Sequence, residues 1–216
     1  MSLCVLVPVL RRPHRVEPLV RSIRENTPGV PRIFFVCDKG DDEEIKVVRR
    51  TIGRYDYVEL EGANYARKIN EGVKCNPDFD HYFFGADDLA FHPGWYEAAI
   101  AKLAPGIGVV STRDLCNARN AKGNLATHPL VTREYAQLGA IDGGGPLHEG
   151  YPHEYVDQEF TETAMHRNAY AFAPDSVVEH LHPQVGKAPM DDLYAAQQTR
   201  MRAGYRIYKS RRHLWM

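Results

Sequence analysis

The chain has 216 residues, of which 44% are hydrophobic and 25% charged, and its formal net charge is −1. These values are typical of a globular protein and exclude a disordered, collagen-like or disulfide-scaffold chain. A net charge near zero provides no bulk attraction for nucleic acid or membranes, although it is compatible with local basic patches. We expect one domain around one substantial core.

Four cysteines are spread along the chain without a CxxC pair, so the sequence indicates neither a zinc ribbon nor a thioredoxin-type redox motif. We expect them to be reduced, buried thiols. The apolar residues 1–9 are too short for a signal-peptide core, and no later stretch approaches the roughly 20 apolar residues of a membrane helix. These features predict a cytoplasmic protein with no membrane segment, and they leave the oligomeric state open.

The first half alternates apolar runs of strand type with segments of helical periodicity. In chain order, the sequence predicts a strand at 3–10, a helix at 16–26, a strand at 32–37, a helix at 43–51, a strand at 57–60, a helix at 65–74, a strand at 81–84 and a helix at 93–103. Continuous apolar strands alternating with helices are typical of a doubly wound, mainly parallel α/β sheet.

The second half is less regular. The sequence predicts a strand at 106–111, a strand or helix edge at 130–138, a glycine-rich loop at 141–150, a helix at 157–166, a strand at 169–179 and a helix at 190–205. The loop with Gly143 to Gly145 is either a lid that excludes water from a site or a plain connector.

Polar stretches follow three of the predicted strands, at residues 8–12, 38–42 and 85–88. Because ligands of such sheets bind beyond the carboxyl ends of the strands, we expect these stretches to line one cleft. The adjacent carboxylates of Asp87 and Asp88 repel each other, and a compensating cation is a natural explanation for them. The alternative is a solvated turn or a helix N-cap.

The order of four short motifs resembles that of family 2 glycosyltransferases and their relatives with the glycosyltransferase A fold. The motifs are Leu6-Val-Pro8 followed by Arg12-Pro13, Val36-Cys-Asp38-Lys-Gly40, Ala66-Arg-Lys-Ile-Asn70-Glu-Gly72, and Phe84-Gly-Ala-Asp-Asp88 followed by His92-Pro-Gly-Trp95. The resemblance covers the first half closely and the rest loosely.

The resemblance implies a single glycosyltransferase A domain with a less regular C-terminal half. Residues 1–104 would bind the nucleotide-sugar donor, and residues 105–216 would bind the acceptor. The implied activity is metal-dependent transfer of a hexose from a nucleotide-sugar, a UDP-sugar above all, to an acceptor hydroxyl, with inversion at the anomeric carbon. The acceptor is left open among a saccharide, a protein and a modified nucleic-acid base.

The resemblance also implies a set of donor-binding residues, namely Pro8, Arg11, Asp38, Arg67 and Asp87. Asp38 would accept the base N–H of a uracil-like or thymine-like donor, although Asp-Lys-Gly is equally typical of a turn. Arg11, Arg12 and Arg67 carry planar guanidinium groups that suit phosphate, but each also suits a solvated surface.

The implied cofactor is Mn²⁺ or Mg²⁺, bound by Asp87, Asp88, His182 and His180. The two histidines alternate in a predicted strand, so they face the same side, and His182 is the preferred ligand. Gly85 stands where a DxD motif has its first Asp. One direct carboxylate suffices when diphosphate and water complete the coordination shell. A zinc site on the histidines is the alternative, but no clear third and fourth ligands accompany them.

In inverting members a carboxylate acts as general base, and here the resemblance assigns that role to Asp157, with Glu154 in reserve. Asp157 is equally suited to cap the helix that follows it.

A nucleotidyltransferase is a rival activity, but the loop after the first strand lacks the glycines typical of that class. A non-catalytic nucleotide- or carbohydrate-binding module is the other rival, and Gly85 is the residue that favours it.

Overall fold

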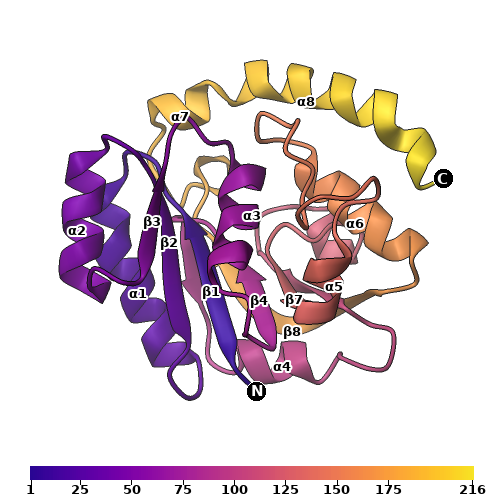
Figure 1. Ribbon diagram of the computed structural model, residues 1–216, viewed down its shortest axis with the longest axis horizontal. Coiled ribbons are helices and arrows are strands. Elements are labelled where there is room, and N and C mark those ends of the chain that lie inside the picture. Colours follow the sequence, from indigo (N-terminus) through magenta and orange to yellow (C-terminus); the bar gives the residue numbers. More distant parts are fainter.

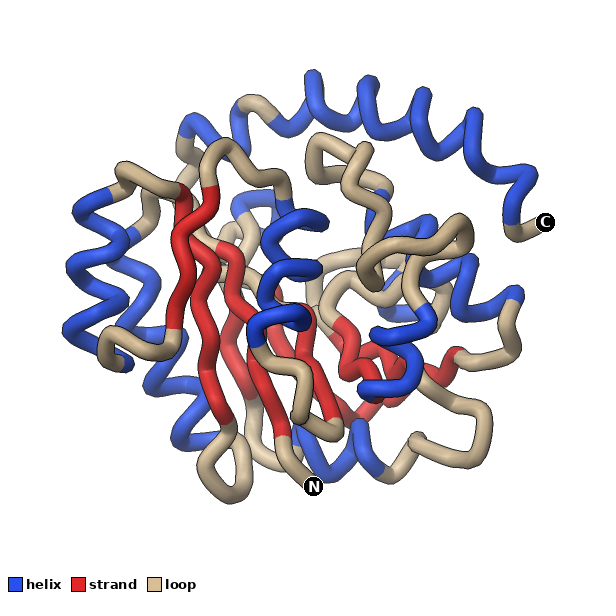
Figure 2. The backbone as a smooth tube through the Cα atoms, in the orientation of Figure 1, coloured by secondary structure: helices blue, strands red, loops and turns tan.

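A sheet of eight strands runs through the molecule in the order β3-β2-β1-β4-β7-β6-β8-β5 (Figure 1, Figure 2). The computed structural model describes residues 1–216, apart from the side chain of Gln198. The strands are β1 (Leu3–Pro8), β2 (Arg32–Asp38), β3 (Tyr57–Leu60), β4 (His81–Phe84), β5 (Leu89–Phe91), β6 (Val109–Arg113), β7 (Pro129–Thr132) and β8 (Tyr170–His180). Strands β1 to β4 pair in parallel, β7 is antiparallel to β4 and β6, and β8 is parallel to β6 but antiparallel to β5.

Helices cover both faces of this sheet. They are α1 (Pro13–Asn26), α2 (Asp42–Ile52), α3 (Tyr65–Cys75), α4 (Trp95–Ile100), α5 (Arg133–Leu138), α6 (Val156–His166), α7 (Asp192–Ala195) and α8 (Gln197–Arg211). The apolar sides of α1, α2 and α4 share one hydrophobic cluster, and those of α3, α5, α6 and α8 share the other. The chain is therefore a single α/β domain with a mainly parallel sheet between two helical layers, as its sequence predicted.

Strand β1 shows why the sheet was readable from the sequence. All six of its residues are buried. Successive side chains of a strand point to opposite faces, so Val5 and Val7 join one cluster while Cys4 and Leu6 join the other. A strand with a core on both faces must be apolar throughout, and this produces the continuous apolar run.

Three sequence expectations differ from the structure. The helix expected at 93–103 is only α4, and it follows the strand β5, whose three residues are too few to show a period. The helix expected at 190–205 is two helices, α7 and α8, joined at Ala196. Cys4 and Cys37 are buried as expected, but Cys75 is exposed and Cys116 is half-buried. Among the described residues, no helix combines the length and apolar character needed to cross a membrane.

Candidate active site

A pocket of about 530 Å³ opens at the carboxyl ends of β1 and β4. Pro8, the last residue of β1, and Arg12, in the loop after it, line the pocket together with Asp87 and Asp88 from the loop after β4. Asp157 in the first turn of α6 and Glu154 just before that helix complete the wall, with His180 at the end of β8 and His182 just after it. This edge of the sheet is where ligands bind in open α/β folds.

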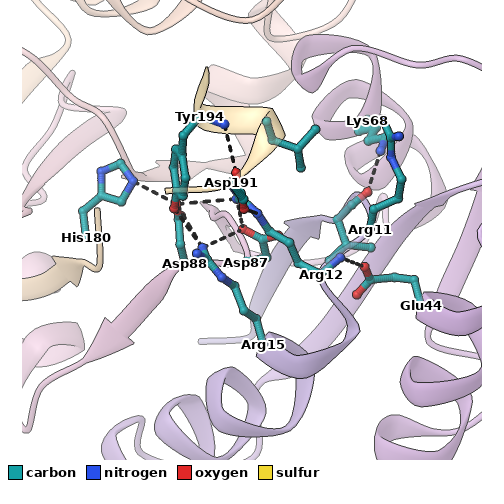
Figure 3. A network of polar contacts seen from close by, with 12 residues as sticks. Arg11, Arg12, Arg15, Glu44, Lys68, Asp87, Asp88, His180, Asp191 and Tyr194 are labelled. Atoms are coloured by element: carbon teal, nitrogen blue, oxygen red, sulfur yellow. Dashed lines mark hydrogen bonds and ion pairs between the residues drawn. The ribbon is translucent and has the colours of Figure 1, made fainter. Parts of the chain in front are cut away.

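The acidic doublet of Asp87 and Asp88 is buried and faces two arginines (Figure 3). Arg12 Nη1 lies 3.1 Å from Asp87 Oδ1 and 3.9 Å from Asp88 Oδ2. Arg15 Nη1 lies 3.6 Å and 3.4 Å from the same two oxygens. The two guanidinium groups supply positive charge that compensates the doublet, where the sequence analysis expects a divalent metal ion.

Helix α7 covers the same cluster from the other side, as Figure 3 shows. Asp191, at the N-cap of α7, accepts hydrogen bonds from Arg12 Nε at 2.8 Å and Nη2 at 3.0 Å. The Tyr194 hydroxyl donates to Asp88 Oδ2 at 2.6 Å, and the Arg12 guanidinium stacks 4.1 Å from the centre of the Tyr194 ring. Arg12 is therefore held by a carboxylate on each side and by an aromatic face.

The two carboxyl groups of the doublet titrate in opposite directions. Burial and the neighbouring charge of Asp88 raise the pKa of Asp87. Burial acts on Asp88 as well, but the hydrogen bonds from His180 Nε2 at 3.2 Å and from Tyr194 outweigh it and lower the pKa of Asp88. The same contact raises the pKa of His180, despite the opposing effect of burial. Asp88 is therefore the stronger acid of the pair.

Gly85 has a structural reason for departing from the DxD pattern. Its N–H donates to the carbonyl of Leu6 at 2.9 Å, and a Cβ at this position would meet that same backbone oxygen at 2.9 Å. A backbone atom cannot turn aside as a side chain can, so any residue larger than glycine would push β4 away from β1. The glycine therefore has a packing role of its own, which keeps the doublet next to β1.

Asp38, at the end of β2, lies beside the pocket and is joined to it by Lys68. Lys68 Nζ donates to Asp38 Oδ2 at 3.0 Å and to the carbonyl of Val9 at 2.6 Å, and Lys68 lines the pocket. The second carboxylate oxygen of Asp38 is buried and has no hydrogen-bond partner among the described residues. A buried acceptor without a donor is costly unless a ligand completes it.

Arg11 and Arg67, both expected at the phosphates, do not line the pocket. The backbone at Arg11 is left-handed, with φ of 51°, and its N–H donates to Asp41 Oδ2 at 2.7 Å. This turn leaves Arg11 exposed and buries the next residue, Arg12. Arg67 is exposed on α3, and its guanidinium donates to the carbonyl of Glu61 at 3.3 Å. The arginines that contact the doublet are therefore Arg12 and Arg15, and the sequence analysis did not single out Arg15.

Asp157 lies in the first turn of α6 and faces the pocket. Tyr155 occupies the N-cap position of this helix, so capping does not account for Asp157. One of its oxygens accepts the backbone N–H of Gln158 at 2.9 Å, and burial raises the pKa of its carboxyl group. Burial raises the pKa of Glu154 as well, and Glu154 accepts a hydrogen bond from Arg200 Nε at 3.1 Å. Asp157 is thus the less engaged of the two carboxylates.

Of the paired histidines, His180 and not His182 contacts the doublet. His182 Nδ1 accepts the backbone N–H of Gln184 at 3.2 Å, and its ring packs against Tyr194 at 4.7 Å between centroids. The sequence missed a third histidine, His128, whose buried ring stands edge-on to His180 at 5.2 Å. His128 immediately precedes β7, and no sequence spacing links it to His180 and His182.

The residues of this site suit a divalent metal only together with a ligand. Among the described residues, no three carboxylate, imidazole or thiolate groups converge closely enough to hold an ion by themselves. Asp88 and His180 do converge, and their oxygen and nitrogen donors suit Mn²⁺ or Mg²⁺. Metal sites on phosphates are commonly built from one or two protein ligands, the phosphate oxygens and water. The site therefore fits an ion that arrives with a diphosphate.

No protein-family model and no curated protein matches the chain. Solved structures of glycosyltransferases do match it. A mannosyltransferase from Pyrobaculum calidifontis, in complex with GDP-Man and Mn²⁺, has a TM-score of 0.65 at 18% identity over 92% of this chain. The chain spans 60% of the length of that mannosyltransferase.

Two further structures have the same architecture. Glucosyl-3-phosphoglycerate synthase from Mycobacterium tuberculosis, in complex with Mn²⁺, UDP and phosphoglyceric acid, has a TM-score of 0.65 at 14% identity, over 94% of this chain and 76% of the synthase. TarS from S. aureus has a TM-score of 0.64 at 14% identity, over 97% of this chain and 72% of the matched chain. At such identities the likeness shows the fold. The chain has the glycosyltransferase A fold that these proteins share.

Proposed function

We propose that the protein is a glycosyltransferase that moves a sugar from a nucleotide-sugar donor, a UDP-sugar above all, to an acceptor hydroxyl with inversion. The buried doublet of Asp87 and Asp88 carries this proposal, because it faces two arginines and His180 at the ligand-binding edge of the sheet. In this proposal residues 1–104 bind the donor and residues 105–216 bind the acceptor.

The donor base would lie against Pro8 and Lys68 and donate its N–H to the free oxygen of Asp38. The diphosphate would then lie near Arg12 and Arg15, whose planar guanidinium groups suit phosphate oxygens. In the structure Asp191 holds the Nε side of Arg12, so a phosphate competes with Asp191 for that side chain. Arg11 and Arg67 have no part in this binding mode.

A divalent ion, Mn²⁺ or Mg²⁺, would be held by Asp88 with His180, while Asp87 and His182 line the same part of the pocket. When bound, it would stabilise the charge that develops on the leaving nucleoside diphosphate. The mannosyltransferase and synthase structures with Mn²⁺ support the choice of metal. Arg12 and Arg15 add positive charge at the same place.

Asp157 would take the proton of the acceptor hydroxyl as that oxygen attacks the anomeric carbon. Burial raises the pKa of Asp157, which brings its basicity closer to that of a useful general base at neutral pH. Glu154 is already engaged by Arg200 and serves better as a positioning residue.

Thermal shift with UDP, with and without Mn²⁺, tests the donor half of the proposal. A ligand that binds only the folded state raises Tm, so UDP with Mn²⁺ should raise Tm in the wild type. Asp88→Asn should abolish the part of this shift that needs Mn²⁺. The matched control is Asp78→Asn, which changes an exposed carboxylate near the opposite end of β4. No Tm shift with UDP or GDP, with or without metal, would refute nucleotide binding.

Turnover separates an enzyme from a binding module. Donor cleavage by the wild type, followed as release of UDP from a UDP-sugar, should fall at least a hundredfold in Asp157→Asn, since general bases contribute roughly 10²–10⁴-fold. UDP binding by this variant should be unchanged. Binding without any donor cleavage in the wild type would instead identify a non-catalytic module.

A further inference from the structure

The segment 193–216 carries an unusual charge for this chain. It holds six of the 27 Lys and Arg residues and none of the 28 Asp and Glu residues, in a protein whose formal net charge is −1. Two of its arginines turn inward. Arg200 pairs with Glu154, and Arg211 pairs with Glu159 and Asp142. The other four cations are exposed, and no ion pair to them occurs among the described residues; they are Arg202, Arg206, Lys209 and Arg212.

Three of these cations form one stripe along α8. Arg202, Arg206 and Lys209 follow the i, i+4, i+7 spacing that places residues on one side of a helix. Gly204 and Tyr208, which are buried, face the opposite way. Like charges four residues apart disfavour a helix, and the helix dipole favours cations only in the last turn. Neither local effect accounts for arginines at 202 and 206.

The stripe begins at the mouth of the pocket. Arg200 and Met201, in the turn that starts it, line the pocket together with Tyr155. Tyr205, which is 48% exposed, packs against Tyr155 with 5.5 Å between ring centroids. Figure 1 shows α8 lying along the outside of the molecule, over the second half of the chain. Aromatic rings therefore lead from the pocket to a row of cations.

We infer that the outer face of α8 binds the sugar-phosphate backbone of a nucleic-acid strand, and that this strand presents the acceptor to the pocket. The inference rests on the proposed function and names its acceptor class. Sequence-independent binders of single strands combine positive charge along the backbone with aromatic rings on which bases stack, and α8 places both side by side. The stripe from Arg202 to Lys209 is about 10 Å long at 1.5 Å per residue, which matches about three phosphates at 3.4 Å per phosphate of one strand.

A membrane surface fits the same charges less well. A helix that lies in a membrane interface buries its apolar side in the lipid. The apolar side of α8 already packs on the domain, through Tyr208 and its neighbour Ile207. The exposed apolar side chains of α8 are single ones, Met201 and Tyr205, so the helix offers a row of cations and no continuous apolar surface to insert.

Fluorescence anisotropy with labelled single-stranded oligothymidylate tests the inference. The variant Arg202→Glu with Arg206→Glu should lose at least roughly tenfold in affinity at low salt, and its slope of log affinity against log salt should fall by roughly 1.4 or more, as expected for two lost phosphate contacts. The matched control is Arg21→Glu with Arg24→Glu, which makes the same charge change at exposed positions of α1 on the other helical layer. It should bind within about twofold of wild type.

Three results would overturn the inference. They are no oligonucleotide binding by the wild type, equal weakening in both double variants, and binding to phosphatidylserine vesicles without binding to the oligonucleotide. The Tm shift with UDP and Mn²⁺ should be the same in wild type and in both double variants, because the stripe lies outside the donor-binding residues. Absence of the UDP-dependent Tm shift in the wild type would count against the proposed function alone. Absence of oligonucleotide binding alone would count against nucleic-acid binding by the outer face of α8.

Discussion

Glu44 is the residue whose replacement should stabilise the protein most clearly. It is fully buried on α2, and its Oε2 accepts the backbone N–H of Arg12 at 2.6 Å. Burial raises the pKa of Glu44 to about 7, outweighing the hydrogen bond from Arg12, and the nearby charge of Asp87 adds to the rise. Glu44→Gln keeps an acceptor oxygen for Arg12 but carries no charge. We predict that it stabilises the fold at pH 8.

The size of the effect follows from linkage between proton binding and folding. The pKa of Glu44 rises from its ordinary value of 4.5 to about 7 on folding, so the folded state binds more protons between these values. The contribution of Glu44 to stability is therefore fully present below pH 4.5 and is lost as the pH rises through 7. At about 1.4 kcal/mol for each tenfold change in proton affinity, the loss amounts to about 3 kcal/mol.

Urea unfolding at pH 5 and pH 8 measures this loss. Relative to wild type, Glu44→Gln should gain about 2 to 3 kcal/mol in unfolding free energy between the two pH values. Glu43→Gln, at the exposed neighbouring position, controls for the general effect of removing a charge and should change little. If wild type and Glu44→Gln respond to pH in parallel, Glu44 is ionised without penalty and the reasoning is wrong.

Two further substitutions probe the pocket and the sheet beside it. Asp38→Asn should weaken UDP binding roughly tenfold to a hundredfold in calorimetry, as expected for the loss of a hydrogen bond to a charged acceptor. The control Asp42→Asn changes an exposed carboxylate and should leave the affinity unchanged. Equal affinities of wild type and Asp38→Asn would remove Asp38 from the donor site. Gly85→Ala should lower the unfolding free energy by about 1 to 3 kcal/mol, because the new Cβ meets the backbone oxygen of Leu6. Gly72→Ala meets only the movable Leu6 side chain and should cost less in the same urea titration, so a larger loss there would contradict the packing argument.

The parallel half of the fold was predictable because its signals are local. Strand β1 is apolar throughout since both of its faces are buried, and the predicted strand at 57–60 matches β3 residue for residue. The second half was harder. Strand β5 has three residues, and α5 directly follows β7 at Thr132, so the 130–138 segment mixes two periods. A periodicity measured over more residues than the element contains includes its neighbours, so the period of a short element is lost.

The acidic doublet was visible in the sequence, but most of its partners were not. Arg15 reads as an ordinary charged residue of an amphipathic helix, and Asp191 and Tyr194 lie 179 and 106 residues away from Arg12 and Asp88, respectively. No spacing rule connects residues that meet only after the sheet has formed. The sequence predicted a phosphate contact for Arg11, whereas the left-handed turn at this residue leaves it exposed.

The closure of the pocket by α7 has a consequence for the order in which the molecule assembles. Synthesis delivers the chain from its N-terminus, so β1 to β4, with Arg12 and the doublet, emerge well before Asp191 and Tyr194. A nascent chain that stops before Asp191 would contain the parallel strands but lack the wall of the pocket that α7 forms. Competence to bind is thus acquired only with the arrival of α7 and α8.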